Sequence, residues 1–359
     1  MTNWKLIKLK FGPVPVHFGE LGIGLEESKE RVHSDTLFSA WVSSYARLFG
    51  KEAVELLLNQ FQENPPVRMS STFLYRQVSE RTIFYLPRPL KLPINYPQDN
   101  DLDYYKTYKG INYLPLEVWQ RWYQEDGFSE NDRQELIDKT NKKDNSKFKK
   151  LKDAGTFDYK DAFYVNRLPK IAIDRVTSST NFYHTSFIQY RHETENQSGL
   201  YFLLKIECND EDLIKRLKAA LIILGEQGIG GERTSGAGQF EAEWLDLPDI
   251  WQSVINLPNA KQHHCLLSMF WDNDPSILEE LIINNPTSSY EIQERGGWFS
   301  QSNIRRKMVR MFAEGSVFPK EPRGKLANVT PNEFKAHKIY RSGICLSLPI
   351  KAETQSLKS

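Results

Sequence analysis

Strand-like and helix-like segments alternate irregularly along this sequence, and this pattern predicts an α+β fold. Residues 4–11 alternate charged and apolar side chains as a half-exposed β-strand does, whereas residues 34–49 place apolar side chains at helical spacing. The expected strands outnumber the expected helices, and they do not follow the regular strand–helix–strand rhythm of a parallel sheet. The length of 359 residues favours two domains.

The first expected domain covers residues 1–246. Ser34 or Asp35 can cap the helix that begins there, and Gly50 can end that helix in the left-handed conformation. In chain order we expect a strand at 4–11, a loop at 12–29, helices at 34–49 and 54–61, a hairpin at 73–86, a long hairpin at 170–192, a strand at 200–207, a helix at 210–224 and a strand at 240–244.

An irregular insertion is expected inside this first domain, at about residues 87–160. Its prolines, Asp-rich turns and decaying periodicity predict little regular structure apart from a helix at residues 116–124. Seven lysines lie between Lys139 and Lys152. We interpret this run as a solvated surface segment rather than as a phosphate contact.

The second expected domain covers residues 263–350 and comes after a linker at 247–262 that carries two prolines. A short basic cluster at residues 305–307 is interpreted as a solvated turn. The expected elements of this domain are strands at 265–271, 290–294, 307–312, 316–318 and 339–348, with helical segments at 277–283 and 332–335.

Composition narrows the classes of function. The net charge is only +1, from 47 Lys and Arg against 46 Asp and Glu, so any nucleic-acid site must be a local patch or be completed by partner chains. Three widely spaced cysteines, Cys208, Cys265 and Cys345, indicate neither a disulfide framework nor a zinc site. No signal-peptide core and no long apolar run is visible, so we expect a cytoplasmic protein without membrane contact.

A glycine-rich loop at residues 225–238 is the most informative motif, with six glycines. A dinucleotide fingerprint that began at Gly228 would need glycine at Arg233, and a P-loop that began at Gly231 would need lysine at Ala237. Both of those motifs also join a strand to the N-terminus of a helix, whereas this loop joins the end of a helix to a strand. The sequence therefore excludes these two nucleotide-binding motifs.

The loop can still bind phosphate in another way. Glycines let successive backbone N–H groups converge and let a ligand approach the backbone closely. Arg233 adds a guanidinium that can hold phosphate through two hydrogen bonds. Six glycines in fourteen residues exceed the needs of one turn, so we favour an anion-binding loop over a purely structural connection.

The segment GIGGERTSGAGQF resembles the glycine-rich loop of the RAMP superfamily of CRISPR proteins, where it lies between the last helix and the last strand of a ferredoxin-like domain. The segments VHFGE, HSDTLFSA, IAIDRVTSST, MFAEGSVF and IYRSGICLSLP are similar to one branch of it. That branch is the fourth Csm protein family, the subunit that caps the crRNA 5′ end in type III-A Csm interference complexes. The resemblance spans most of the chain except the insertion.

This resemblance implies two tandem ferredoxin-like (RRM-like) domains that bind the repeat-derived 5′ handle of crRNA, without a nuclease activity or a cofactor. The implied partners are the crRNA, the large polymerase-like Cas subunit and the backbone RAMP subunit. Carried over by position, the RNA-facing candidates are His17, Arg175, Thr177, Gly228, Gly230, Gly231, Arg233, Thr234, Ser235, Gly236 and Gly238.

The alternative function is a metal-independent endoribonuclease that cuts CRISPR repeats, with His17 or His33 as its general base. For His33 we favour a place beside a helix cap made by Ser34 or Asp35 over an acid–base role. His263, His264 and Cys265 adjoin in an expected strand and point to alternate faces, so we expect no metal site there. A third alternative is a purely structural cap that makes no RNA contact.

Overall fold

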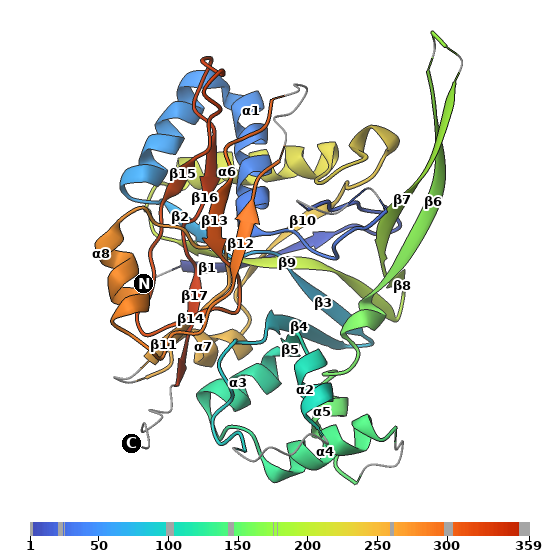
Figure 1. The fold of residues 1–359 in the computed structure, drawn as a ribbon, viewed down its shortest axis with the longest axis vertical. Coiled ribbons are helices and arrows are strands. Elements are labelled where there is room, and N and C mark those ends of the chain that lie inside the picture. Colours follow the sequence, from blue (N-terminus) through green and yellow to red (C-terminus); the bar gives the residue numbers. More distant parts are fainter. Residues whose placement is uncertain are drawn as a thin grey trace.

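The computed structural model describes residues 3–20, 24, 26–97, 104–142, 147–174, 176–177, 179–258, 262–297 and 304–351. An eight-stranded antiparallel sheet forms the centre of the molecule, and a three-stranded sheet lies beside it (Figure 1). Helices cover both sheets, and no regular parallel strand–helix–strand unit occurs in the described residues. The predicted α+β class is therefore confirmed.

The main sheet is organised around β1 (Asn3–Lys10), which pairs with β9 (Asn196–Ile206) on one side and β10 (Glu241–Asp246) on the other. Both faces of β1 are covered, because Leu6, Ile7 and Leu9 are fully buried. The sheet continues from β9 through β3 (Phe73–Val78), β4 (Arg81–Pro87) and β5 (Tyr113–Pro115), and β9 also pairs with the short strands β2 (Val67–Met69) and β8 (His192–Glu193).

Two helices pack on one face of this sheet, α1 (Ser34–Glu63) and α6 (Glu211–Gln227). The two helices predicted at 34–49 and 54–61 are the two segments of α1, which meet at a kink where Gly50 has a φ of +83°. The predicted cap of α1 is wrong. The hydroxyl of Ser34 accepts from the backbone N–H of Met269, and Asp35 faces two arginines of the second half.

The insertion is folded, which contradicts the predicted irregular segment. It contains α2 (Tyr105–Gly110), α3 (Leu116–Gln124), α4 (Glu130–Thr140), α5 (Lys150–Asp153) and η1 (Tyr159–Ala162). Its own core is aromatic, with Trp119 and Trp122 fully buried. Helices this short carry little periodicity, so their stability comes from this core rather than from a visible sequence pattern. The predicted helix at 116–124 is confirmed.

A long hairpin of β6 (Phe163–Ile173) and β7 (Thr180–Tyr190) projects from the body of the molecule (Figure 1). This confirms the hairpin predicted at 170–192 and extends its first strand towards the insertion. The outer parts of both strands are exposed, including the apolar side chains of Leu168, Ile171 and Phe182.

The second half contains small sheets and short helices. The linker at 247–262 holds a helix that was not predicted, α7 (Ile250–Ile255), whose Trp251 is fully buried. Residues 332–333 form a turn and residues 334–335 are irregular, in place of the expected helix. The other elements are β11 (Gln262–Leu266), α8 (Pro275–Leu278), η3 (Glu279–Ile283), β12 (Ile292–Arg295), β13 (Val309–Phe312), β14 (Val317–Phe318), β15 (Leu326–Asn328), β16 (Tyr340–Ser342) and β17 (Ser347–Lys351).

A buried cluster of ion pairs joins the start of α1 to this second half. The carboxylate of Asp35 has no exposed surface; it accepts from the Nε and Nη2 atoms of Arg295, both at 3.0 Å, and from Arg341. Burial alone would raise the pKa of Asp35, but the two arginines lower that pKa to about 2. The pairing therefore contributes stability above pH 4, which is lost as the pH falls towards 2.

A second group of ion pairs lies next to it. Glu314 accepts from Arg31 at 3.2 Å and 3.3 Å and from the Nδ1 atom of His33 at 2.8 Å, and the Nε2 atom of His33 lies 2.6 Å from Glu20. Burial alone would raise the pKa of Glu314, but Arg31 and His33 hold it well below its usual range. The pKa of His33 is raised despite burial because Glu314 stabilises the imidazolium.

We predict that Asp35→Asn destabilises the protein by about 3–5 kcal/mol, because it leaves Arg295 and Arg341 buried without their counter-charge. Urea unfolding measures this change. Asp246→Asn is the matched control, since Asp246 is exposed and pairs with Lys5 at the surface, and it should change stability little. Equal unfolding midpoints for Asp35→Asn and the wild type would show that the cluster does not hold the two halves together.

Candidate nucleic-acid interface

The glycine-rich loop begins where α6 ends. Gly228 has a φ of +80°, and its N–H donates to the carbonyl of Leu224 at 2.8 Å, so glycine ends this helix in a conformation that other residues rarely adopt. The predicted position of the loop, between a helix and the strand β10, is confirmed.

Both ends of the loop are attached to the segment at residues 15–17. The N–H of Gly231 donates to the carbonyl of His17 at 2.8 Å, and the N–H of Gly238 donates to the carbonyl of Pro15 at 2.9 Å. A Cβ atom at Gly230 would lie 2.4 Å from the carbonyl oxygen of His17. These glycines are therefore required by the packing of the loop itself.

The tip of the loop, residues 232–236, remains exposed apart from Glu232. Arg233, Thr234 and Ser235 form a single turn, η2 (Arg233–Ser235), and Gly236 comes next with a φ of +82° and open space around it. Glu232 forms an ion pair with Lys170 of β6. The tip is thus exposed to a ligand and is attached to β6 of the long hairpin.

The structure brings only some of the other predicted residues to this loop. His17 is buried, and its Nδ1 atom lies 2.8 Å from the carbonyl oxygen of Ser186 on β7, so this side chain joins the loop to the hairpin. Thr177 lies in the turn between β6 and β7, away from the loop, where its hydroxyl contacts that of Ser179 at 2.8 Å. Arg175 lies outside the described residues.

A cavity of about 560 Å³ lies beside the loop, between Gly228–Arg233, the first turns of α1 and parts of the second half. Of the arginines that line this cavity, the sequence indicated only Arg233. The others come from segments far apart in the sequence. Arg306 belongs to the basic cluster at 305–307 that we interpreted as a solvated turn; Arg305 and Lys307 are exposed, whereas Arg306 is half-buried and lines the cavity. The arginines that line the cavity are Arg31, Arg47, Arg233, Arg295, Arg306 and Arg341.

Carboxylates compensate only part of this positive charge. Glu314 holds Arg31, and Asp35 holds Arg295 and Arg341. Arg47 donates to the neutral side chain of Gln227 at 2.6 Å, and none of the ion pairs among the described residues includes Arg233 or Arg306. The cavity therefore carries a net positive charge next to a loop with exposed backbone, as an anion site requires.

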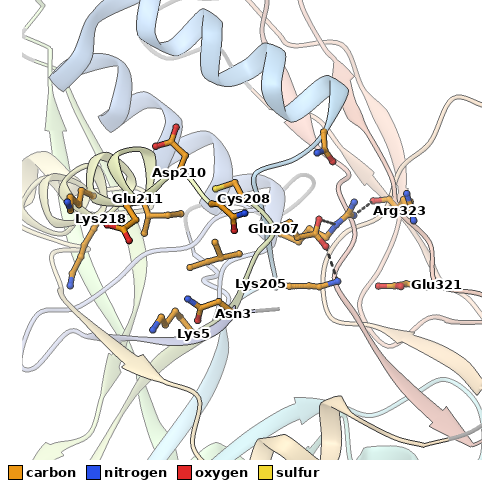
Figure 2. A pocket seen from close by; sticks show the side chains of 16 residues that line it. Asn3, Lys5, Lys205, Glu207, Cys208, Asp210, Glu211, Lys218, Glu321 and Arg323 are labelled. Atoms are coloured by element: carbon orange, nitrogen blue, oxygen red, sulfur yellow. Dashed lines mark hydrogen bonds and ion pairs between the residues drawn. The ribbon is translucent and has the colours of Figure 1, made fainter. Parts of the chain in front are cut away.

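A larger cavity, of about 1030 Å³, is the weaker candidate (Figure 2). Glu207 accepts from Lys205 at 2.9 Å (Figure 2). It also accepts from Arg68 at 2.8 Å. Lys5 pairs with Asp246 at its edge, and Glu211 and Glu321 also line it. Carboxylates hold much of its positive charge, so it attracts a polyanion less than the arginine-lined cavity does.

In the described parts of the chain, the histidines form neither a catalytic acid–base pair nor a metal-binding cluster. His33 is clamped between two carboxylates in the buried cluster, and His17 is occupied by the carbonyl of Ser186. Within the described ranges, no group of three or more His, Cys, Asp or Glu side chains could hold a metal ion. None of the described helices is long and apolar enough to cross a membrane.

The cavity is lined by the glycine-rich loop from the first half of the chain and by arginines from the second half, and comparisons with known proteins match these two halves separately. Residues 15–241, which contain the glycine-rich loop, match the RAMP superfamily. Residues 259–350, which contain Arg295, Arg306 and Arg341, match the CRISPR Csm4 C-terminal domain.

Relatives and solved structures extend over almost the whole chain. A Csm4 protein of Methanocaldococcus jannaschii is 24% identical over 384 residues and covers 96% of each chain, and one of Thermococcus onnurineus is 25% identical over 307 residues, covering 81% of this chain and 83% of the relative. In fold, the chain is similar to a chain of a Csm3–Csm4 subcomplex of the type III-A interference complex, with a TM-score of 0.60, 19% identity and coverage of 97% and 100%. A Csm1–Csm4 cassette in complex with cA4 contains a chain with a TM-score of 0.55, 17% identity and coverage of 98% and 99%.

The match at residues 15–241 spans well over half of the 359 residues, and the second match covers most of the C-terminal remainder. The protein therefore belongs to the RAMP superfamily, with a C-terminal domain of the CRISPR Csm4 type.

Proposed function

We propose that this chain is the subunit of a type III-A Csm ribonucleoprotein that binds the 5′ handle of the crRNA. The observation that carries this proposal is the arginine-lined cavity beside the exposed tip of the glycine-rich loop. Single-stranded RNA is held mainly through its backbone charge, together with contacts to splayed bases, and a local basic cavity supplies the first of these. The near-zero net charge fits a site confined to one place.

The candidate residues then divide into two roles. Arg233, Thr234, Ser235 and Gly236 contact RNA phosphates from the tip of the loop. Gly228, Gly230, Gly231, Gly238 and His17 hold the loop in place, because their contacts are made within the protein. Thr177 lies in the turn of the hairpin and contacts RNA beyond the loop, and Arg175 is proposed as a further RNA contact.

The order of elements supports two ferredoxin-like domains, residues 1–246 and 263–350. In the first, β1, α1, β3, β9, α6 and β10 succeed one another, and the sheet order β10–β1–β9–β3 suits a split β-α-β-β-α-β unit. In the second, β11 lies between β14 and β17, and Ser289 extends this sheet through a bridge to Val317. In chain order, the β15–β16 ribbon lies between β14 and β17, at the place of the second helix of such a domain.

The partner assignment rests on the relatives. Similar chains occur in solved complexes with Csm3 and with Csm1. We infer that this chain likewise caps a backbone of RAMP subunits and contacts the large polymerase-like subunit. The exposed apolar side chains of the long hairpin offer one surface for such a contact.

We predict that Arg233→Ala weakens binding of handle-containing crRNA by about ten- to a hundredfold, the loss of a charge-assisted contact of about 1.5–3 kcal/mol. The slope of log affinity against log salt should shrink by about 0.7. Binding is measured across a salt series with the subunit in its complex. Arg216→Ala on the exposed face of α6 is the matched control, because Arg216 lies outside the cavity.

A second substitution separates RNA contact from folding. Gly236→Asn adds a side chain in open space, and asparagine tolerates positive φ better than most residues, so it should weaken RNA binding with little loss of stability. Gly230→Val should instead unfold the loop, because its Cβ would meet His17. Unchanged affinity and slope in both Arg233→Ala and Gly236→Asn would make the loop purely structural.

We also propose that the subunit is not an endoribonuclease. The two candidate bases, His17 and His33, are buried and occupied by protein groups. Purified protein incubated with CRISPR repeat RNA, without added metal, should leave the RNA intact. Site-specific cleavage that His33→Ala abolishes would contradict this proposal.

A further inference from the structure

Two arginines of the cavity have hydrogen-bonding capacity that the described protein does not use. The Nε atoms of Arg306 and Arg341 are buried and have no hydrogen-bond partner in the described parts of the chain. Arg341 is only 5% exposed, and both residues line the cavity beside the glycine-rich loop. A buried N–H without an acceptor costs free energy, so such a pair indicates a missing acceptor.

The charges around these atoms indicate that the acceptor is an anion. The guanidinium groups of Arg295, Arg306 and Arg341 lie around the single carboxylate of Asp35. Arg295 already donates to both carboxylate oxygens of Asp35. Glu20 lies 3.8 Å from Arg295 and 2.6 Å from His33. At least one negative charge therefore remains to be supplied at this end of the cavity.

The pKa values reflect the same imbalance. Burial lowers the pKa of Arg306, and the positive charge of Arg341 lowers it further. Burial also lowers the pKa of Arg341, and Arg295 adds to this effect while Asp35 opposes it. A group with two oxygens and a negative charge, placed between these arginines, would relieve both the repulsion and the unpaired N–H groups.

We propose that Arg306 and Arg341 form a subsite for one phosphate group of the bound RNA. This proposal rests on the proposed function and adds a second contact, supplied by the other half of the chain. Phosphate is favoured over a carboxylate of a partner protein because Arg233, the proposed phosphate contact of the glycine-rich loop, lines the same cavity. The planar guanidinium matches phosphate oxygens through two hydrogen bonds.

RNA that reached both this subsite and the glycine-rich loop would bridge the two halves of the protein. The glycine-rich loop belongs to the first half, whereas Arg306 precedes β13 and Arg341 lies in β16. Binding there should therefore stabilise the folded chain, because a ligand bound only by the folded state raises its stability.

The test uses Arg306→Gln in the full chain, because Arg306 has no ion pair in the described protein and its loss should not destabilise the fold. Arg310→Gln is the matched control, since Arg310 is exposed, pairs with Glu294 and does not line the cavity. Without RNA, we expect sodium phosphate to raise the melting temperature of the wild type and of Arg310→Gln above its value in sodium chloride of equal ionic strength. Arg306→Gln should lose this increase and should melt no lower than the wild type in chloride.

The second experiment measures the affinity of handle-containing crRNA for the subunit in its complex. Arg306→Gln should bind about tenfold or more weakly, with a salt slope smaller by about 0.7, whereas Arg310→Gln should match the wild type. Wild-type RNA binding in both variants, with no phosphate effect in the first experiment, would overturn the subsite and leave the proposed function standing.

Two other results of these experiments would lead to different conclusions. Phosphate stabilisation that depends on Arg306, together with no binding of handle RNA by the wild-type complex, would overturn the assignment to RNA and the proposed function with it. If Arg306→Gln weakens assembly with the backbone RAMP subunit in the absence of RNA, and leaves RNA binding unchanged, the arginines take a carboxylate of that protein and the phosphate subsite is wrong.

Discussion

The ion pairs of Asp35 with Arg295 and Arg341 are the constraint on which the rest of the arrangement depends. A carboxylate with no exposed surface can stay charged only if cations accompany it, and these cations lie 260 and 306 residues further along the chain. Satisfying Asp35 therefore fixes the start of α1 against β12 and β16. The same contact brings positive charge from the second half to the cavity beside the glycine-rich loop, so the candidate site depends on how the halves are joined.

The glycine-rich loop depends on a second set of contacts, made by backbone groups. Most of its glycines allow the loop to pack against residues 15–17 and against itself, and they leave a short exposed tip that carries Arg233. The ion pair between Glu232 and Lys170, with the contact of His17 to Ser186, attaches this tip to the long hairpin. The loop and the arginines of the buried ion cluster thus line the cavity, and the hairpin is attached to the loop.

Sequence patterns predicted the parts of this structure that local physics determines. The alternation in β1, the apolar spacing of α6, and the loop between α6 and β10 could all be predicted from the sequence. The superfamily was recognised from the loop and its neighbouring segments. The misread cap at Asp35 shows the limit, because an acidic residue at a helix start is usually a cap and its real partners are distant in sequence. The insertion was missed because its aromatic core gives short helices without clear periodicity, and the cavity arginines were missed because only folding brings them together.

If the proposed function holds, RNA lies between the glycine-rich loop and the arginines of the second half. Photo-crosslinking can locate the RNA: crRNA with 4-thiouridine in the handle is bound to the assembled complex and irradiated, and the crosslinked peptides are mapped by mass spectrometry. We expect crosslinks from the handle to peptides that contain residues 228–240 and to peptides that contain residues 304–311. Crosslinks confined to the insertion, or to the cavity around Lys205 and Glu207, with none at the loop or at Arg306, would contradict it.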